Sequence, residues 1–569
     1  MTTLDVRYQG VSGVRSADLS ESTFGFATNA LRPQGYLRGR LTHVERVREV
    51  LGTLHGVVVS DLKRRPKDRE AWKRWLAEQD QKFLLGLKVK SQGAADALHA
   101  IESRLAVLDG RRAIRRAPFV AARRRYADYV VNHTSELMWL YDPVVTVHPD
   151  EVFFEAFSKD ESSYARVGID RALLKDEGDV VCGTTNIDFS RALARHLDRL
   201  RTYKDTTLQI GPGGVEISVG DAVHREQKIP LPESWVNGFL QVQATMTMAL
   251  TSVRLDPIAL HGVLRVLMAK KARTSPKALR FELVPGKPAR LVLEPWEIPV
   301  DVGVVYQGPK AESVRIWGRD RLKLLARLLP LATDVRVELA GLGLPSFWTV
   351  DLGGVSFTLG LSGWTDNDWT GQQAKEKGGD ATRFELLTRR LDGTVDELMR
   401  VYATLKDARV ATDDAVAAAS GLSVEKTRSA LSLLAQAGRA TYDLRLRRYR
   451  HRDLFFDTFT ADEAKRVTRQ QPGGPQAQKA QQIFDGDGVR IIMRRPTPPD
   501  DPRPGYKLSG SVKGLSAEQV RPQLHVDGEG QIISGTCTCR FFGDHGLTKG
   551  PCEHLLALRL AHMQKLGAS

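Results

Sequence analysis

Cys537-Thr538-Cys539 and Cys552-Glu553-His554, with twelve residues between them, form the stretch that decides how the end of this 569-residue chain folds. Three of the four cysteines of the chain lie within these eighteen positions, together with His554. Thiolates and an imidazole are ligands that zinc prefers, four at a time in a tetrahedron. The spacing therefore predicts a zinc site formed by Cys537, Cys539, Cys552 and His554.

The local sequence supports this interpretation. Cys537 and Cys539 are two residues apart, so on an extended segment both side chains point to the same face. Pro551 precedes the apolar run Leu555-Leu556-Ala557-Leu558, as at the start of a helix, whose free N–H groups would stabilise Cys552 as a thiolate. The alternative is that the cysteines pack as small hydrophobic residues and that His554 lies on the surface. A disulfide is less favoured, because nothing marks the chain as exported.

Two further histidines lie close to this stretch. His545, inside the twelve-residue insert, could compete with His554 for the metal, although its Gly-Asp neighbours are typical of a loop. His562 comes two helical turns after His554 and is expected on the surface.

The Cys-x-Cys and Cys-x-His pattern resembles the SWIM zinc finger, a small ββα unit. Strand-like segments at 506–512, 524–526 and 531–533, with a turn at 527–530, precede the first cysteine pair, and residues 552–562 read as the helix. The resemblance covers residues 505–569. It implies a closed structural zinc site and a binding role toward DNA or protein.

Composition describes a globular protein, and its charge favours a polyanionic partner, although arginine-rich proteins are often basic without one. The chain has 42% hydrophobic and 27% charged residues and a formal net charge of +15. Its length indicates about three or four domains. The excess of positive charge favours a polyanionic partner such as DNA. No long apolar span or signal peptide is evident, so we expect a cytoplasmic protein without a membrane segment.

The fold class expected from the whole chain is multidomain α+β. Residues 1–141 are predicted to be mostly helical and basic, with an amphipathic helix at 94–107 and arginine-rich clusters at 63–67 and 111–125. These clusters could bind phosphates, form a solvated helical face or contact an acidic protein. Residues 142–380 read as a mixed α/β domain, in which 189–219, 256–293 and 320–359 could be repeats of one helix followed by two strands.

Residues 381–465 are predicted to form a winged-helix-like domain. Helices are expected at 395–408 and 413–420 and after Ser423, with Thr412 and Ser423 as N-caps, followed by an alternating strand at 441–449. The resemblance to a winged helix-turn-helix is one of pattern. A Pro/Gln-rich linker at 466–504 is expected to separate this domain from the zinc unit.

The same segment supplies the candidate nucleic-acid contacts. Between residues 421 and 452, eight Lys or Arg residues stand against two acidic residues. In a DNA-binding version of this fold, the third helix would present Lys426 and Arg428 to a groove. The strand would present to phosphates the side chains of Arg445, Arg447, Arg448 and Arg450.

Sequence motifs of common enzymes are absent, since no phosphate-binding Gly-x-x-x-x-Gly-Lys-Ser/Thr loop, dinucleotide fingerprint or His-Glu-x-x-His motif occurs. We therefore expect a non-enzymatic recognition protein that binds zinc, and DNA or a protein partner. The layout also resembles bacterial SWIM proteins encoded beside MoxR-type AAA+ ATPases and von Willebrand A-domain proteins. That resemblance implies the alternative, a protein-only adaptor or scaffold in an ATPase-driven assembly.

Overall fold

The fold is that of a computed structural model, which describes most of the chain. The described residues are 13–15, 21–27, 36–61, 103–105, 107–108, 143–176, 180–186, 197, 200–203, 205–211, 233–341, 343–364, 367–371, 383–388, 393–454, 458–469, 475–498, 504–514 and 519–567. Residues 1–61 and 141–569 form one compact unit, and residues 62–140 form another.

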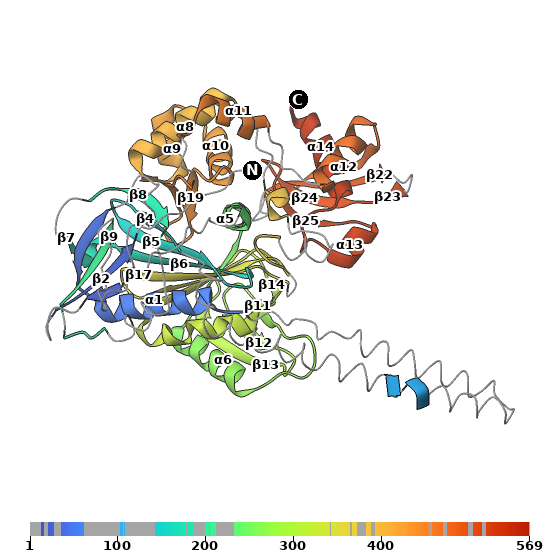
Figure 1. The fold of residues 1–569 in the computed structure, drawn as a ribbon. Coiled ribbons are helices and arrows are strands. Elements are labelled where there is room, and N and C mark those ends of the chain that lie inside the picture. Colours follow the sequence, from blue (N-terminus) through green and yellow to red (C-terminus); the bar gives the residue numbers. More distant parts are fainter. Residues whose placement is uncertain are drawn as a thin grey trace. The chain divides into compact units, whose positions relative to one another are not determined.

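The largest element is an antiparallel sheet of eight strands (Figure 1). In spatial order its strands are β10 (Thr251–Leu255), β15 (Asp334–Leu339), β16 (Ser346–Asp351), β17 (Val355–Leu361), β6 (Ser163–Asp170), β5 (Glu151–Phe157), β4 (Val144–Val147) and β8 (Gly183–Asn186). Helix α1 (Val44–Val58) packs on β5, β6 and β17 through its apolar stripe. Side chains on both faces of β5 are buried, so this strand lies at the centre of the fold.

Two smaller sheets accompany the large one. A four-stranded sheet has the order β13 (Ile298–Val305), β12 (Pro288–Leu293), β11 (Leu279–Leu283) and β14 (Glu312–Ile316), and α6 (Pro257–Ala269) packs on β13. A five-stranded sheet contains β1 (Gly13–Arg15), β2 (Glu21–Ala27), β9 (Asp205–Gly211), β3 (Leu37–Leu41) and β7 (Leu174–Asp176). The remaining helices of this part are η1 (Arg171–Leu173), α5 (Glu233–Met246), η2 (Arg319–Arg327), η3 (Leu329–Leu331) and η4 (Phe384–Leu387).

The helix-plus-strand segments do not repeat one arrangement. In the second segment, β11 and β12 pair directly as a hairpin within the four-stranded sheet. In the third, β15 and β17 are separated by β16, and the preceding helix η2 is a 3-10 helix. Much of the first segment lies outside the described residues. Similar hydrophobic runs therefore enter sheets of different topology.

Residues 393–469 form a unit that we call the helical module. It contains α8 (Val395–Ala408), β18 (Val410–Ala411), α9 (Asp413–Ser420), α10 (Val424–Gln436), β19 (Ala440–Asp443), β20 (Arg448–His451) and α11 (Ala461–Arg469). The expected N-caps are confirmed, because the hydroxyls of Thr412 and Ser423 accept the N–H groups of Ala415 and Lys426. The single strand expected at 441–449 is instead a hairpin, which turns at residues 444–447.

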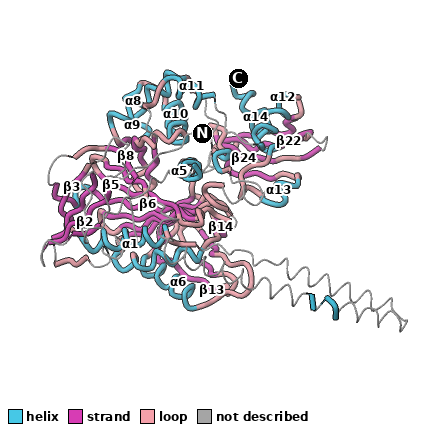
Figure 2. Tube along the Cα trace, in the orientation of Figure 1, coloured by secondary structure: helices cyan, strands magenta, loops and turns pink. Residues whose placement is uncertain are grey.

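Residues 475–567 form the C-terminal module (Figure 2). Its elements are α12 (Pro475–Asp485), β21 (Val489–Pro496), β22 (Gly505–Lys513), β23 (Gln519–Val520), β24 (Gln523–Asp527), β25 (Ile532–Thr536), α13 (Arg540–His545) and α14 (Glu553–Gly567). The segment expected to be a linker contributes α12, which packs on α14, and β21, which pairs with β22. The module thus begins about thirty residues earlier than expected. Pro496 ends an edge strand, where its missing N–H costs no ladder hydrogen bond.

The N-terminal region contains strands that its composition did not predict. Strands β1 to β3 and helix α1 come from residues 13–58, and residues 103–105 and 107–108 are helical. The arginine-rich clusters at 63–67 and 111–125 lie outside the described residues. Among the residues described, no helix combines the length and apolarity needed to cross a bilayer.

Two histidines are buried where the helical module meets the large sheet, and they generate a prediction about pH. Nε2 of His148 lies 2.7 Å from the backbone oxygen of His451. Burial, assisted by the charge of Arg450, lowers the pKa of His148 to about 3. Burial also lowers the pKa of His451 to about 4. Both pKa values lie below the unfolded value of about 6.5. The contribution of the two neutral imidazoles to stability is therefore fully present above about pH 6.5 and declines as the pH falls toward 4.

We expect His148→Gln to weaken this decline. The amide of Gln can still donate a hydrogen bond to the His451 oxygen but does not titrate. Urea midpoints between pH 7 and pH 4 measure the effect, with His261→Gln on α6 as the control. Because wild type and variants share the zinc ligands, their difference isolates the buried imidazole. Identical pH profiles for wild type and His148→Gln would contradict the assignment.

Candidate metal centre

The four predicted ligands come together at one end of the C-terminal module. Cys537 follows β25, Cys539 precedes α13, and Cys552 and His554 lie at the start of α14. One ligand atom from each of the four lies within 4.8 Å of the others. Sulfur atoms bound to one tetrahedral zinc ion at about 2.3 Å are about 3.8 Å apart, so a shift of about 1 Å or less would close the site. The cluster can hold a metal ion, and its ligand types fit zinc.

The backbone around the ligands is arranged to stabilise thiolates. Sγ of Cys539 accepts the N–H of Phe542 at 3.4 Å, so this cysteine is the N-cap of α13. The hydroxyl of Thr538, between the first two ligands, accepts the N–H of Arg521 at 3.1 Å. Cys552 immediately precedes α14, where free amide groups favour negative charge. These contacts fix both ends of the twelve-residue insert.

The electrostatics of the cluster favour a bound cation. Burial disfavours the charged form of His554, yet hydrogen bonds with the sulfur atoms of Cys537 and Cys539 raise the pKa of His554 to about 9. Hydrogen bonds from Cys537 and Cys552 lower the pKa of Cys539 below its ordinary value. A group of three sulfur atoms that attracts a proton onto the imidazole also attracts a metal ion, which would displace that proton.

The apolar run after the ligands forms the core of the module. Leu555 and Leu558 of α14 are fully buried, and they belong to the same cluster as Leu508 of β22 and Leu524 of β24. Gly510 of β22 makes room for this helix, because a Cβ there would lie 2.7 Å from the side chain of Leu558. The four clustered residues thus lie at the start of a helix whose next turns fill the core.

The C-terminal module also contacts an earlier segment of the chain. The guanidinium of Arg559, buried on α14, donates to the backbone oxygens of Leu386 and Thr388, both at 3.0 Å. In the insert, the oxygen of Lys549 accepts the N–H of Arg383 at 3.1 Å. Gly550 has φ +100°, and a Cβ there would lie 2.6 Å from the Arg383 oxygen, so only glycine fits. Residues 383–388 therefore depend on the fold around the metal cluster.

The two additional histidines take no part in the cluster. His545 ends α13, with its ring 5.0 Å from that of Phe541. His562 is fully buried, so the expectation of a surface position is wrong. Its Nδ1 accepts from Nε of Arg494 at 3.2 Å, and its ring lies 4.9 Å from that of Tyr506. Residues of β21 and β22 cover this turn of α14, and β21 was the strand that sequence analysis assigned to a linker.

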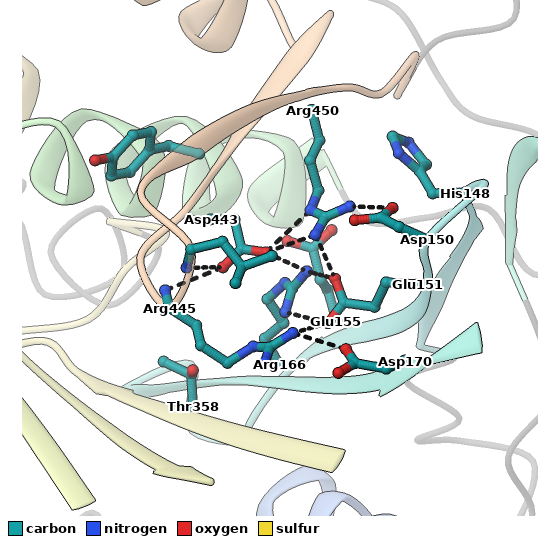
Figure 3. Close-up of polar contacts among 12 residues, drawn as sticks. His148, Asp150, Glu151, Glu155, Arg166, Asp170, Thr358, Asp443, Arg445 and Arg450 are labelled. Carbon is teal, nitrogen blue, oxygen red and sulfur yellow. Dashed lines mark hydrogen bonds and ion pairs between the residues drawn. The ribbon is translucent and has the colours of Figure 1, made fainter. Parts of the chain in front are cut away.

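The six candidate nucleic-acid contacts have two kinds of environment. Arg448 is exposed on β20. Lys426 and Arg447 are exposed and Arg428 is half-buried, and these three lie 2.8 Å from Glu397, 3.6 Å from Glu338 and 2.5 Å from Asp413, respectively. Arg445 and Arg450 instead point toward carboxylates of the large sheet and are mostly or fully buried (Figure 3). The side chain of Arg450 is 0% exposed, and that of Arg445 is 16% exposed. The predicted DNA contacts stay a prediction, and in this structure five of the six lie near carboxylates.

Those partners form a charged cluster that sequence analysis did not single out. Glu151 and Glu155 lie on β5, and Arg166 lies opposite Glu155 on β6. The signal is visible in the sequence of β5, where both glutamates alternate with phenylalanines of a buried strand. Charged residues in such a strand require partners of opposite charge from elsewhere in the chain.

Comparison with known proteins does not identify a family for this chain. No protein-family model matches the sequence, and no curated protein matches it. Among solved structures, proliferating cellular nuclear antigen from Entamoeba histolytica covers 39% of this chain and 89% of its own, with 10% identity and a TM-score of 0.27. PCNA of A. fulgidus, bound by the C-terminal region of FEN-1, covers 39% and 89%, with 11% identity and a TM-score of 0.26. PCNA from Thermococcus kodakaraensis covers 40% and 93%, with 11% identity and a TM-score of 0.26. Similarity at this level assigns neither fold nor function.

The cluster predicts one zinc ion per chain. Elemental analysis of the purified protein should give about one equivalent, lost when Cys537→Ser and Cys539→Ser are combined, because two of four ligands are removed. Cys182→Ser is the matched control, since Cys182 lies outside the cluster and its loss should leave the zinc content unchanged. Full zinc content in the double variant would refute the assignment.

Removal of the metal should loosen a defined part of the chain. Hydrogen exchange after chelation is expected to accelerate in residues 475–567 and also at 383–388, because Arg559 holds the latter segment. Exchange in β5 and β6, which contain no ligand and lie in the large sheet, should not change. Uniform acceleration through the large sheet would show that the metal supports the whole fold instead.

Proposed function

We propose that the chain is a zinc-binding, non-enzymatic recognition protein, with a SWIM-type zinc finger at its C-terminus and a winged-helix-like helical module as its binding parts. The Cys3His cluster is the observation that carries this proposal. Four protein ligands complete a tetrahedral zinc site, so no position is left for substrate or for an activated water molecule. In such a site the metal organises a binding surface.

DNA is the first candidate partner. Three exposed cations, Lys426 at the start of α10 and Arg447 and Arg448 in the hairpin, belong to the segment in which eight Lys or Arg residues stand against two acidic residues. The side chains of Lys426 and Arg447 are mostly exposed, whereas their carboxylate partners Glu397 and Glu338 are 14% and 5% exposed. A phosphate backbone can replace such partners and release its own counterions.

A protein partner is the second candidate. The observation that favours it is the internal pairing of Arg445 and Arg450, which leaves fewer cations for DNA in this conformation. An assembly with a MoxR-type AAA+ ATPase and a von Willebrand A-domain protein remains the specific form of this proposal. Its basis is the resemblance of the sequence layout.

The salt dependence of DNA binding tests the first candidate. For full-length protein and a duplex, Arg447→Ala combined with Arg448→Ala should weaken binding to any sequence and reduce the slope of log affinity against log salt by up to about 2, one unit for each lost phosphate contact. Lys426→Ala with Arg428→Ala should instead relax sequence preference, because these positions would face base edges.

The matched control is Lys465→Ala with Arg466→Ala. It removes the same charge from exposed positions on α11, outside the proposed surface. This control should retain the wild-type slope. No binding of the wild-type protein to duplex DNA at low salt would exclude the DNA candidate and leave the protein partner.

A further inference from the structure

The β19–β20 hairpin (residues 440–452) has two chemically different faces. Side chains alternate along a strand, so Tyr449 and His451 point one way and Arg448 and Arg450 the other. Tyr449 packs in the core of the helical module with Leu431 and Leu434. The opposite face of the hairpin is therefore an arginine face, which Arg452 continues.

The arginine face lies against carboxylates of the large sheet, as Figure 3 shows for Arg450. Nη1 of Arg450 donates to Asp150 at 2.8 Å, and its Nη2 lies 3.0 Å from Glu151. Arg452 is paired with Glu155, and both side chains are fully buried. These contacts join residues about 300 positions apart in the sequence.

The turn of the hairpin makes a second set of contacts. Arg445 donates to Asp170 at 2.7 Å and lies 3.5 Å from Asp351. Asp443 holds the turn, because its Oδ1 accepts the N–H groups of Arg445 and Leu446. Burial disfavours its charge, yet Arg166 and Arg450 lower the pKa of Asp443 to about 2.

A glycine in the large sheet leaves space for one of these carboxylates. Gly168 lies beside Glu151, and a Cβ at that position would lie only 1.9 Å from the Glu151 carboxylate. The absence of that side chain lets Glu151 reach Arg166, at 2.6 Å, and Arg450 at once. The sheet side carries five carboxylates and one guanidinium, namely Asp150, Glu151, Glu155, Asp170, Asp351 and Arg166. This arrangement is a row of anionic oxygens facing arginines.

The helical module otherwise has a core of its own. Its buried apolar residues form a cluster separate from that of the large sheet. Of the residues that the structure describes between 393 and 469, only Tyr442, Leu444 and Leu454 join the larger cluster. Because the desolvation of buried charges offsets much of their attraction, a charged contact of this kind adds less net stability than an apolar one of equal area. Because its core is separate, the module does not depend on this charged contact for its own packing.

We propose that the carboxylates of the large sheet mask an anion-binding surface on the hairpin, and that the phosphate backbone of duplex DNA competes for the same arginines. Guanidinium groups bind phosphate and carboxylate oxygens with the same planar geometry. In the masked state Arg445, Arg450 and Arg452 contact Asp170, Glu151 and Glu155. In the DNA-bound state they contact phosphates, and the sheet carboxylates become exposed to solvent. This inference rests on the proposed DNA-binding function and adds its regulation.

The first test weakens the mask from the sheet side. Asp150→Asn with Asp170→Asn removes two half-exposed partners of Arg450 and Arg445, at the edge of the contact. The control, Asp301→Asn with Asp320→Asn, makes the same charge change at exposed partners of Arg290 and Lys323. We compare the affinities of the full-length variants for a 5′-labelled duplex of about 20 base pairs. The mask variant should bind about tenfold more tightly than the control, because less of the binding free energy is needed to release the arginines from the sheet carboxylates.

The second test measures the solvent exposure of the sheet carboxylates. Glu151 and Glu155 are buried, so carbodiimide-driven labelling with glycine ethyl ester should be slow in the free protein and several-fold faster with DNA. Asp462, exposed on α11, serves as the internal reference. Equal affinities of mask and control variants, or unchanged labelling of Glu151 and Glu155 in a formed DNA complex, would overturn the mask and leave DNA binding intact. No DNA binding by any variant, the mask variant included, would overturn the DNA-binding function and the mask together.

Discussion

The convergence of Cys537, Cys539, Cys552 and His554 at one point is the constraint on which the C-terminal part of this protein depends. It joins the end of β25, the N-cap of α13 and the first turn of α14, which are separate in the sequence. Because the position of α14 is fixed there, its leucines meet β22 and β24, and Arg559 reaches residues 383–388. A metal ion held by these four residues would add stability to a module whose core is small.

The second constraint is the cost of burying charge. Arg450 and Arg452 are fully buried, and each is acceptable only because a carboxylate of β5 meets it. The contact thus specifies one position of the helical module on the sheet. Its geometry depends on Gly168, which leaves space for Glu151 to reach both Arg166 and Arg450.

The sequence predicted the features that are determined by residues close together in the chain. The grouping of three cysteines with His554, the caps at Thr412 and Ser423, and the helices of the helical module follow from spacing and residue type, and the structure has them. The linker predicted from the Pro-rich stretch is wrong, because Pro496 lies at the end of the edge strand β21, where a proline is tolerated. The burial of His562 and the partners of Arg445 and Arg450 depend on strands distant in the sequence. No local pattern encodes such contacts, although the glutamates among the phenylalanines of β5 indicated that partners were needed.

X-ray absorption at the zinc edge of the purified full-length protein tests the central claim, a metal site closed by four protein ligands, most directly. The account predicts three sulfur ligands at about 2.3 Å and one nitrogen ligand at about 2.0–2.1 Å, with no further oxygen ligand. An oxygen in the first coordination shell in place of one sulfur or of the imidazole would contradict it. Such a shell would describe an open site, in which the metal could act on a bound water molecule instead of organising a binding surface.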